Sequence, residues 1–397
     1  MIGIIGKPNS GKTTFFNAAT LSNAPVANYP FTTIEPNVGI GYVSSPCVCR
    51  ELGVVDNPVN SKCVDGIRYV PVKLIDIAGL IPGAYKGLGL GNKFLDEIRR
   101  ADALIHVVDI SGSTNEEGKP VPPGSHDPLR DIEFVEREYE LWMLSIVKKD
   151  WDRLKKFHKV DDFIDGLSKR LSGLKISVDD IKEAIRRSGL EGKRPFEWKA
   201  DELTNFVKEI RRINKPIVIA ANKADLPTAK ENIRRVKKTG RVVIAVSAEA
   251  ELLLKRAAST GLIRYRPGDS DFTIVRDDMT LQQRKALELV RERVLKVYGS
   301  TGVQQVINEV FINVLNCIIV YPVEDENRFT DRKGRVLPDA FIVKKGATVR
   351  MLAEMIHTEL AKGFLYAIDA KRKIRIGAEY KLQNRDVVKI VSATMRG

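Results

Sequence analysis

Cysteine is scarce in this chain, and long apolar runs are missing. Cys47, Cys49, Cys63 and Cys317 are the four cysteines among 397 residues, too few for a disulfide framework. No run of about 18 apolar residues exists to span a bilayer. The apolar residues 2–5 predict a first strand at the very start, with no space for a targeting segment before it. We therefore expect a cytoplasmic protein without a membrane contact.

The role of the three neighbouring cysteines stays open at the sequence level. Cys47, Cys49 and Cys63 fall in a region that predicts a hairpin. Zinc sites usually use a Cys-x₂-Cys spacing and need a fourth ligand, and neither is evident here. Ordinary buried thiols are therefore favoured over a zinc site.

The charge balance favours a polyanionic partner. The chain carries 65 Lys and Arg residues against 51 Asp and Glu residues, a formal net charge of +14. Such an excess favours RNA or the ribosome, and nothing points to DNA specificity. A chain selected for heat stability is also rich in Lys and Glu, which is the alternative explanation.

The most informative motif follows the first strand directly. It has the form Gly-x-x-x-x-Gly-Lys-[Ser/Thr] and is made by Gly6, Lys7, Pro8, Asn9, Ser10, Gly11, Lys12 and Thr13. In such a loop, backbone N–H groups surround the phosphates of a nucleotide, the lysine reaches the terminal phosphates and the threonine hydroxyl binds Mg²⁺. A helix starting at Thr14 is predicted to follow. The motif predicts a nucleoside triphosphate as ligand.

Two later loops indicate that the base is guanine. The apolar residues 215–221 predict a buried strand that delivers Asn222, Lys223 and Asp225 at its carboxyl end. Asp225 accepts from two guanine donors that adenine lacks, Asn222 braces the loop, and the Lys223 stem lies over the base. A second predicted strand, 241–246, ends in a loop whose backbone N–H groups face the guanine O6; this loop contains Ser247, Ala248 and Glu249.

The residues expected to sense the γ-phosphate lie between these motifs. A strand over 72–75 runs into the Asp-x-x-Gly pattern of Asp76 and Gly79, whose carboxylate holds Mg²⁺ through water and whose glycine N–H contacts the γ-phosphate. Thr13 and Asp76 are thus two predicted magnesium-binding residues. A third ligand is expected from the segment 29–37, where Thr33 is favoured.

Three segments together resemble the Obg family of GTPases, closest to its YchF and Drg branches. They are 28–33, 76–84 and 87–95. The chain departs from that family in two ways. There is no room for the glycine-rich amino-terminal domain of Obg proper, and residues 222–225 have the guanine form of the loop rather than the altered, ATP-favouring form of YchF proteins.

The catalytic residue is unknown. The glutamine that orients water in Ras-like enzymes is replaced by Leu80, which has no donor or acceptor, so slow hydrolysis is expected. The resemblance implies an alternative, because Asn9 occupies a position that binds a K⁺ ion in several GTPases lacking that glutamine. The other reading is that Asn9 tolerates the left-handed geometry of a tight loop.

The predicted fold is α/β: a P-loop GTPase domain with a mostly parallel sheet and helices on both faces, a helical insertion and a carboxyl-terminal β-grasp domain. The predicted parts are 1–111 and 216–316 for the GTPase domain with its connecting helices, 112–215 for the insertion, and 317–397 for a segment that resembles a TGS domain. In the TGS-like part a helix is expected from the N-cap Thr348 to Leu360, with His357 on its face or in the core.

The sequence therefore predicts a GTP-hydrolysing switch that binds GTP and GDP with Mg²⁺, and K⁺ as a second candidate ion. It is expected to act on ribosomes or RNA, with a protein regulator as a further candidate partner. One alternative is a GTP-gated module that binds RNA or protein and hydrolyses GTP only as a slow reset. A metabolic ATPase is less favoured, because its chemistry needs no guanine-reading loop.

Overall fold

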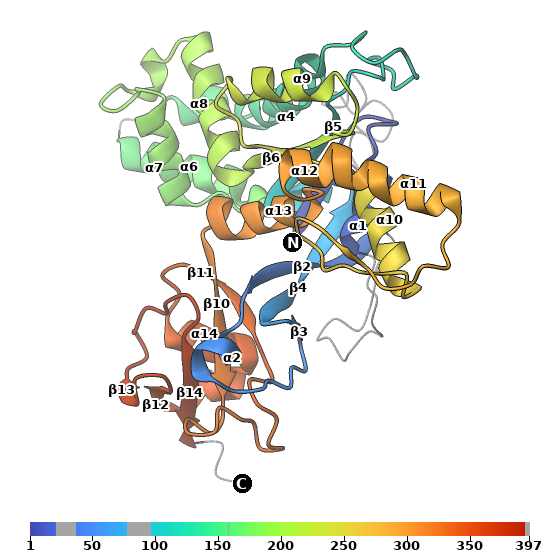
Figure 1. Ribbon diagram of the computed structural model, residues 1–397. Coiled ribbons are helices and arrows are strands. Elements are labelled where there is room, and N and C mark those ends of the chain that lie inside the picture. The colour runs from blue at the N-terminus through green and yellow to red at the C-terminus, as the bar shows by residue number, and fades with distance from the viewer. Residues whose placement is uncertain (21–36, 78–96, 158, 394–397) are drawn as a thin grey trace. The chain divides into compact units, whose positions relative to one another are not determined.

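The computed structural model describes residues 1–20, 37–77, 97–157 and 159–393 (Figure 1). Its contacts divide the chain into two compact units. Unit 1 comprises 1–18, 37–39 and 73–306, and unit 2 comprises 19–36, 40–72 and 307–397. This division by packing differs from the boundaries expected from the sequence, which stay a prediction.

Unit 1 is built on a parallel sheet. Its strand order is β4-β1-β5-β6-β7, and each neighbouring pair runs parallel. The strands are β1 (Ile2–Ile5), β4 (Ile67–Asp76), β5 (Ala103–Asp109), β6 (Ile217–Asn222) and β7 (Val243–Ala245). Every residue of β1 and β5 is buried, as expected for the continuous apolar runs of a central parallel strand. All five strands therefore end at one edge of the sheet, where the loops of the predicted site begin.

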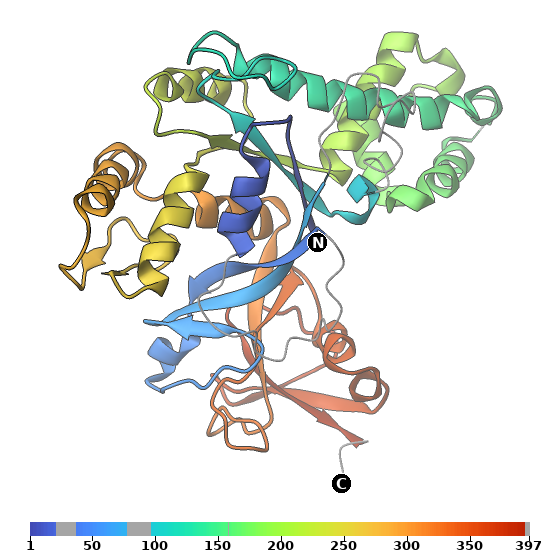
Figure 2. The ribbon, with the colours of Figure 1, turned by 90° about the vertical axis from the view of Figure 1, so that its right-hand side faces the viewer.

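Helices cover both faces of this sheet (Figure 2). On one side lie α1 (Lys12–Thr20) and α10 (Ala248–Ser259), and on the other lie α4 (Pro128–Lys148) and α8 (Ala200–Asn214). This arrangement confirms the predicted α/β class.

The segment between β5 and β6 is helical, as expected. After α4 it contains α5 (Trp151–Leu154), α6 (Val160–Leu171) and α7 (Val178–Arg187) before α8. These helices share a core with the sheet, in which the Trp198 ring packs edge-on against Phe163 and Phe206 with centroids 5.5 and 5.0 Å apart. The described part of the insertion is thus packed on the GTPase sheet rather than separate from it.

Further elements of unit 1 follow β6 and β7. They are α9 (Ala229–Lys237), β8 (Ile263–Arg264), β9 (Thr273–Ile274), α11 (Leu281–Val290), α12 (Lys296–Tyr298) and the start of α13 (Val303–Asn308). Helix α11 packs on α10 through Leu287 and Val290, which share a cluster with Leu254. The connecting helix α11 therefore packs on α10 of the GTPase domain.

Unit 2 contains the expected β-grasp sheet. Its order is β11-β10-β14-β12-β13, with bounds β10 (Cys317–Val323), β11 (Phe341–Lys344), β12 (Phe364–Asp369), β13 (Ile374–Ile376) and β14 (Val387–Ser392). Helix α14 (Val349–Ile356) packs on it through Val349 and Leu352.

The predicted long helix in unit 2 is wrong in one respect. The chain is extended at His357, which ends α14 and caps α15 (Thr358–Lys362) by accepting a hydrogen bond at Nδ1 from the Glu359 N–H, 3.2 Å away. His357 is exposed, so it is neither a helix-face nor a core residue. Thr348 caps α14 as expected, accepting from the Met351 N–H.

A helical turn over Glu309–Val314 precedes β10, and further described elements of unit 2 come from the first quarter of the chain. They are β2 (Val38–Pro46), α2 (Val48–Leu52) and β3 (Lys62–Val64), which pairs antiparallel with the start of β4. Among the described helices of both units, none is long and apolar enough to cross a bilayer.

Candidate functional site

The predicted phosphate loop lies between β1 and α1, as the motif requires. Gly11 has φ +88°, and a Cβ atom there would lie 2.2 Å from Nδ2 of Asn222, so only glycine fits. Asn9 also has a left-handed backbone, with φ +60°. The Phe15 N–H donates to the Gly11 carbonyl at 2.8 Å and starts the helix. The N–H groups of the first turn of α1, which have no carbonyl partner within the helix, therefore point toward the loop.

Lys12 and Asp76 are brought together at this loop. The Lys12 ammonium donates to a carboxylate oxygen of Asp76, although 64 residues separate them. Thr13, in the first turn of α1, is exposed. A hydroxyl and a carboxylate are ligands that Mg²⁺ prefers, so the donor set of Thr13 and Asp76 fits the ion that the family implies.

Asn222 connects the phosphate loop with the last loop of the site. Its Nδ2 donates to the Ser10 carbonyl at 2.9 Å, and its Oδ1 accepts from the Ala248 N–H at 3.1 Å. The side chain is buried, so both bonds are shielded from water. The predicted brace is present, and it spans two loops rather than one.

Asp225 and Ser247 meet as two loops converge. The Ser247 hydroxyl donates to Asp225 Oδ1 at 2.8 Å and accepts from the Ala250 N–H as N-cap of α10. Ser247 itself is buried, while Asp225 is partly exposed. The bond fixes one carboxylate oxygen of the residue expected to bind guanine.

Lys223 is engaged by a residue that sequence reasoning missed. Its Nζ donates to Asp109 Oδ2 at 2.8 Å and to the Ser113 hydroxyl at 3.2 Å. Burial acts to raise the pKa of Asp109, but hydrogen bonds from Lys223, Ser111 and Ser113 outweigh it and hold that pKa below its usual value. Asp109 is the last residue of β5, and its position at the end of a buried strand was the available signal.

The loop after Asp109 contacts the phosphate loop through Lys7. The Lys7 ammonium contacts the Thr114 carbonyl at 2.9 Å, the Asn115 carbonyl at 2.8 Å and Asp131 Oδ2 at 2.7 Å. Two of these contacts are hydrogen bonds and the third is an ion pair, and the side chain is 7% exposed. Lys7 therefore points into the protein, which leaves only its backbone N–H for a phosphate.

Asn9 joins the same loop. Its Nδ2 donates to the Gly118 carbonyl at 2.9 Å. A Cβ atom on Gly118 would lie 2.6 Å from the Pro8 carbonyl oxygen, so the two segments are in tight contact. The segment that contains Gly118 thus packs against the phosphate loop.

Several predicted residues add less to this geometry. Thr14 is a partly exposed residue of α1, and Glu249 is exposed in the first turn of α10. Thr33, Gly79 and Leu80 lie outside the described residues. The roles of all predicted nucleotide-binding residues stay predictions at this point.

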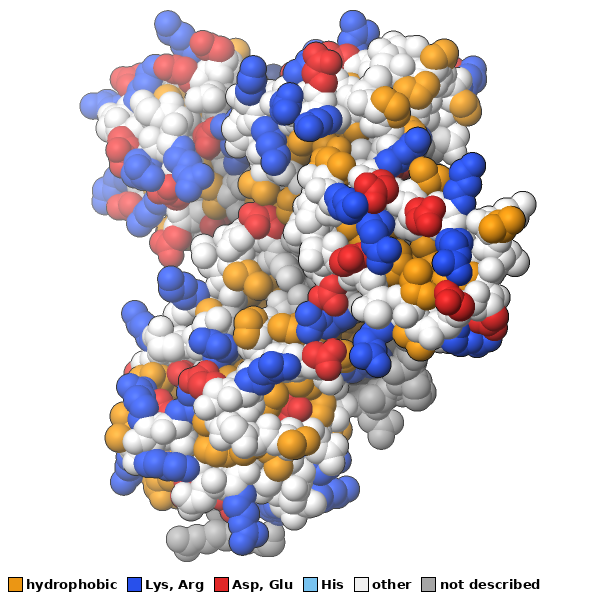
Figure 3. Space-filling model, in the orientation of Figure 1, with side chains coloured by type: hydrophobic (Ala, Val, Ile, Leu, Met, Phe, Trp, Pro, Cys, Tyr) orange, Lys and Arg blue, Asp and Glu red, His pale blue; other side chains and the backbone are white. Residues whose placement is uncertain are grey.

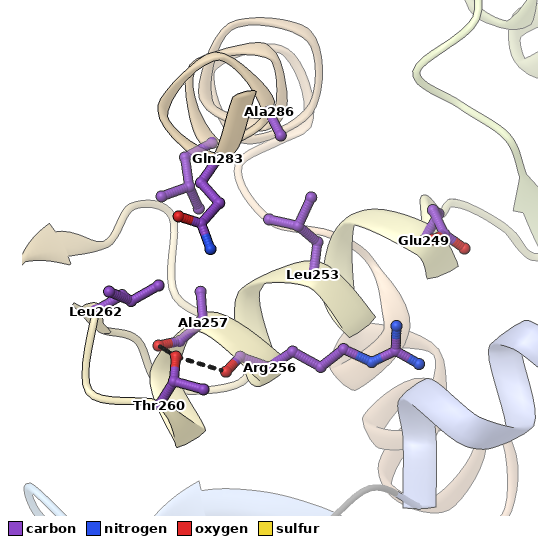
Figure 4. Close-up of a pocket in the computed structure, with 9 residues that line it drawn as sticks. Glu249, Leu253, Arg256, Ala257, Thr260, Leu262, Gln283 and Ala286 are labelled. Atoms are coloured by element: carbon purple, nitrogen blue, oxygen red, sulfur yellow. Dashed lines mark hydrogen bonds between the residues drawn. The ribbon is translucent and has the colours of Figure 1, made fainter. Parts of the chain in front are cut away.

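An apolar cavity of about 290 Å³ lies between α10 and α11, apart from the loops above (Figure 4). Leu253 and Ala257 of α10 face Gln283 and Ala286 of α11 across it, and Glu249 lines one end. The Thr260 hydroxyl bonds the backbone carbonyls of the preceding turn. The lining offers no cluster of acids or nucleophiles, so we assign this cavity no chemistry.

Helix α9 carries a group of exposed basic side chains (Figure 3). Lys230, Arg234, Arg235 and Lys237 lie on its exposed side and Lys238 caps it, against a single acid, Glu231. Of these, Arg235 pairs with Asp127 at 2.9 Å. Helix α9 is therefore a positively charged ridge of unit 1.

Comparison with protein families agrees with these features. The family described as a 50S ribosome-binding GTPase matches residues 1–141, the Obg-like GTPase YGR210-like, G4 motif-containing domain matches 220–325, and the TGS domain matches 328–392. The last match confirms the resemblance of the β-grasp part to a TGS domain.

Whole proteins match over nearly the full chain. A GTP-binding protein of Methanocaldococcus jannaschii is 52% identical over 99% of both chains, and a protein of Bacillus subtilis named ribosome-binding ATPase YchF is 29% identical over 97% of both. The crystal structure of a GTP-binding protein from Pyrococcus horikoshii superposes with a TM-score of 0.76, at 42% identity and 99% coverage of each chain. The chain belongs to the YchF/Obg-like family of P-loop GTPases.

Proposed function

We propose that this GTPase is a slow molecular switch whose GTP-bound form docks on the ribosome or its RNA. The observation that carries the proposal is the double hydrogen bond of Asn222 to Ser10 and Ala248, which ties the phosphate loop to the predicted guanine loop. Because one side chain holds both loops, recognition of the base is coupled to the position of the phosphates.

In this proposal the phosphate loop, Gly6 to Thr13, surrounds the phosphates with its backbone, and Lys12 contacts their terminal oxygens. Without nucleotide, Lys12 pairs with Asp76. When Mg²⁺ and a triphosphate bind, the Lys12 ammonium would pair with the phosphates and the Asp76 carboxylate with the Mg²⁺. Thr13, Thr33 and Asp76 would hold the Mg²⁺, which when bound neutralises charge on the phosphates. Gly79 would contact the γ-phosphate through its N–H.

Guanine would be read by Asp225, with Ser247 holding one of its oxygens and the backbone of Ala248 and Glu249 near the base. The pairing of Lys223 with Asp109 would tie the loop that contains Asp225 to the end of β5. GTP, rather than ATP, is the proposed substrate. The name of the Bacillus relative refers to ATP, so this specificity needs a direct test.

Slow hydrolysis follows from Leu80, which offers no group to orient water. A K⁺ ion near Asn9 is the proposed source of compensating charge. Asn9 donates to Gly118 through Nδ2, so its Oδ1 faces a different direction and is the atom suited to a cation.

Ribosome or RNA association is supported by the names of several relatives, by the net charge of +14 and by the basic helix α9. Binding that relies on such cations weakens steeply with salt. Association with ribosomes would place the protein in the cytoplasm.

The deciding experiment is sedimentation with ribosomal subunits in the presence of GTP, GDP or no nucleotide. We expect the GTP state to bind several-fold more tightly than the GDP state. A Lys230→Glu/Arg234→Glu/Lys237→Glu variant should weaken that binding and reduce its salt dependence while leaving GTP affinity unchanged.

The matched control changes three exposed basic residues of another helix by the same charge: Lys182→Glu, Arg186→Glu and Arg187→Glu in α7. Equal binding in all nucleotide states would contradict the switch. Equal loss in the α7 control would mean that net charge alone, and not helix α9, carries the contact.

A further inference from the structure

Three cysteines and one aspartate converge at one place in unit 2. Cys47 precedes α2, Cys49 lies within it, Asp56 is in the following loop and Cys63 is in β3. Their ligand atoms, three Sγ and one carboxylate oxygen, all lie within 4.8 Å of one another. Cys47 and Cys49 are buried, and Asp56 and Cys63 are partly buried.

The distances fit a tetrahedral metal site. Four ligands at a Zn–S distance of about 2.3 Å have sulfur atoms about 3.8 Å apart. The Cys49 and Cys63 sulfur atoms are 3.9 Å apart, and Cys47 Sγ is 3.2 Å from Asp56 Oδ2. A disulfide needs its sulfurs about 2.05 Å apart, and pairing two of three cysteines would leave the third.

The donor types select the metal. Thiolates are soft ligands that favour zinc over Mg²⁺ or Ca²⁺, and a set of three thiolates with one carboxylate leaves no position open for a substrate. Such closed sites stabilise folds. The ion would therefore be structural.

A buried arginine lies beside the cluster. Arg68, at 0% exposure, donates from Nη1 to Asp56 Oδ2 at 3.1 Å and also donates to the Leu337 carbonyl. Three thiolates and one carboxylate carry four negative charges, of which zinc offsets two and Arg68 one more. A hydrogen-bonded residue behind a metal ligand is the usual way in which a protein fixes the orientation of that ligand.

The surrounding elements are short. Helix α2 has five residues and β3 has three, and the chain between them has no regular structure. Such segments bury little surface of their own, so a metal that joins them would contribute much of their stability.

We propose that Cys47, Cys49, Asp56 and Cys63 bind a structural zinc ion that joins α2, the loop 53–61 and β3. The sequence favoured buried thiols because the fourth ligand was not evident, and the structure supplies a candidate for it in Asp56.

The first test measures metal in full-length protein purified under reducing conditions without chelators. We expect about one zinc per chain by elemental analysis. After exchange of zinc for Co²⁺, the spectrum should show sulfur-to-cobalt charge transfer and the strong visible bands of a tetrahedral site. Protein that contains no zinc and also takes up neither Zn²⁺ nor Co²⁺ would overturn the proposal. A Cys49–Cys63 disulfide that persists under the reducing conditions would also overturn it.

Variants assign the ligands. Cys49→Ser and Cys63→Ser should each lower zinc affinity by about tenfold or more, whereas Cys317→Ser, at a cysteine outside the cluster, should keep the ion. If the serine variants do not fold, Asp56→Cys keeps the test decisive. It should retain zinc and change the cobalt charge-transfer bands, because a fourth sulfur replaces the oxygen; unchanged bands would exclude Asp56 as a ligand.

Discussion

The side chain of Asn222 donates a hydrogen bond to the backbone carbonyl of Ser10 across 2.9 Å, although 212 residues separate them in sequence. The same amide accepts from the Ala248 N–H. Three loops that come from three different strands are thereby held by one buried group. Since β1, β6 and β7 are parallel neighbours of β5 or of each other, their ends are near enough for a single side chain to reach.

Removing this group should loosen the site without unfolding the chain. Asn222→Ala deletes two buried hydrogen bonds of about 1 kcal/mol each, so we expect GTP affinity to fall about tenfold or more. Asn60→Ala is the matched control, because Asn60 also donates to a backbone carbonyl and accepts from a backbone N–H, both of Ala340, and belongs to none of the nucleotide loops. GTP titration of both variants checks the prediction, and equal affinities would refute it.

Base specificity should depend on Asp225. Asp225→Asn replaces an acceptor with a donor facing guanine, so GTP affinity should fall by about a hundredfold and xanthosine triphosphate should become the better ligand. The measurement is competitive titration with GTP, ATP and xanthosine triphosphate. If wild-type protein binds ATP and GTP equally, the guanine assignment fails.

The bond from Ser247 to Asp225 gives a separate prediction. Ser247→Ala loses a hydrogen bond to a charged group, worth about 1.5 kcal/mol, so GTP affinity should fall about tenfold. Ser247→Thr keeps the hydroxyl and should restore most of it. Ser259→Ala, at the other end of α10, removes a hydroxyl bonded only to the local backbone and is the control. Failure of threonine to rescue would contradict the role assigned to this hydroxyl.

Alanine substitutions at Gly11 and Gly189 distinguish the effect of backbone strain from that of a steric conflict. Both have positive φ, +88° and +71°, but a Cβ atom on Gly11 meets Asn222 at 2.2 Å whereas none of the described atoms lies within 4 Å of one on Gly189. Gly189→Ala should therefore cost only about 1 kcal/mol of stability. Gly11→Ala should abolish nucleotide binding. Similar effects of the two substitutions on GTP titration would contradict this reasoning.

Much of this site could be predicted because the motifs carry their geometry with them. The spacing of Gly6, Gly11 and Lys12 requires a strand, a tight loop and a helix, and the structure has all three. Asn222 and Asp225 follow a buried strand for the same reason. Local spacing and parallel strand order were enough to place these residues.

Other features were not predictable, because they depend on distant segments with no pattern. Nothing in the sequence near Lys7 shows that its ammonium contacts Thr114, Asn115 and Asp131. Asp56 is one acid among many until folding places it beside three thiols. The break at His357 was missed because the apolar spacing continues through α14 and α15 and is insensitive to a single extended residue.

Two substitutions at Asn9 distinguish a role in binding K⁺ from a role in the backbone geometry of the loop. Replacing Na⁺ by K⁺ should raise GTP turnover in wild-type protein, and both Asn9→Ala and Asn9→Gly should abolish that rise because both lose the Oδ1 ligand. Glycine adopts the φ of +60° without strain. A glycine variant that retains the potassium effect would show that Asn9 matters only for loop geometry.

The last prediction concerns His106, which lies in β5 with 1% exposure and has a buried Nδ1 without a hydrogen-bond partner among the described residues. Burial lowers its pKa from 6.5 to about 4; Lys7 adds to that shift and Glu136 opposes it. Between these pH values the unfolded chain binds a proton that the folded chain does not, so stability falls as the pH decreases from about 6.5 to 4.

The expected contribution is about 3 kcal/mol, at about 1.4 kcal/mol per pH unit. His106→Leu removes the titrating group. As the pH falls from about 6.5 to 4, the urea midpoint should therefore decrease less in the variant than in the wild type. Carboxylates that do not interact with His106 affect both proteins equally and cancel in the difference; Glu136, which does interact with it, is the exception. Parallel pH profiles would show that His106 has the same pKa in the folded and unfolded chains, and would contradict the prediction.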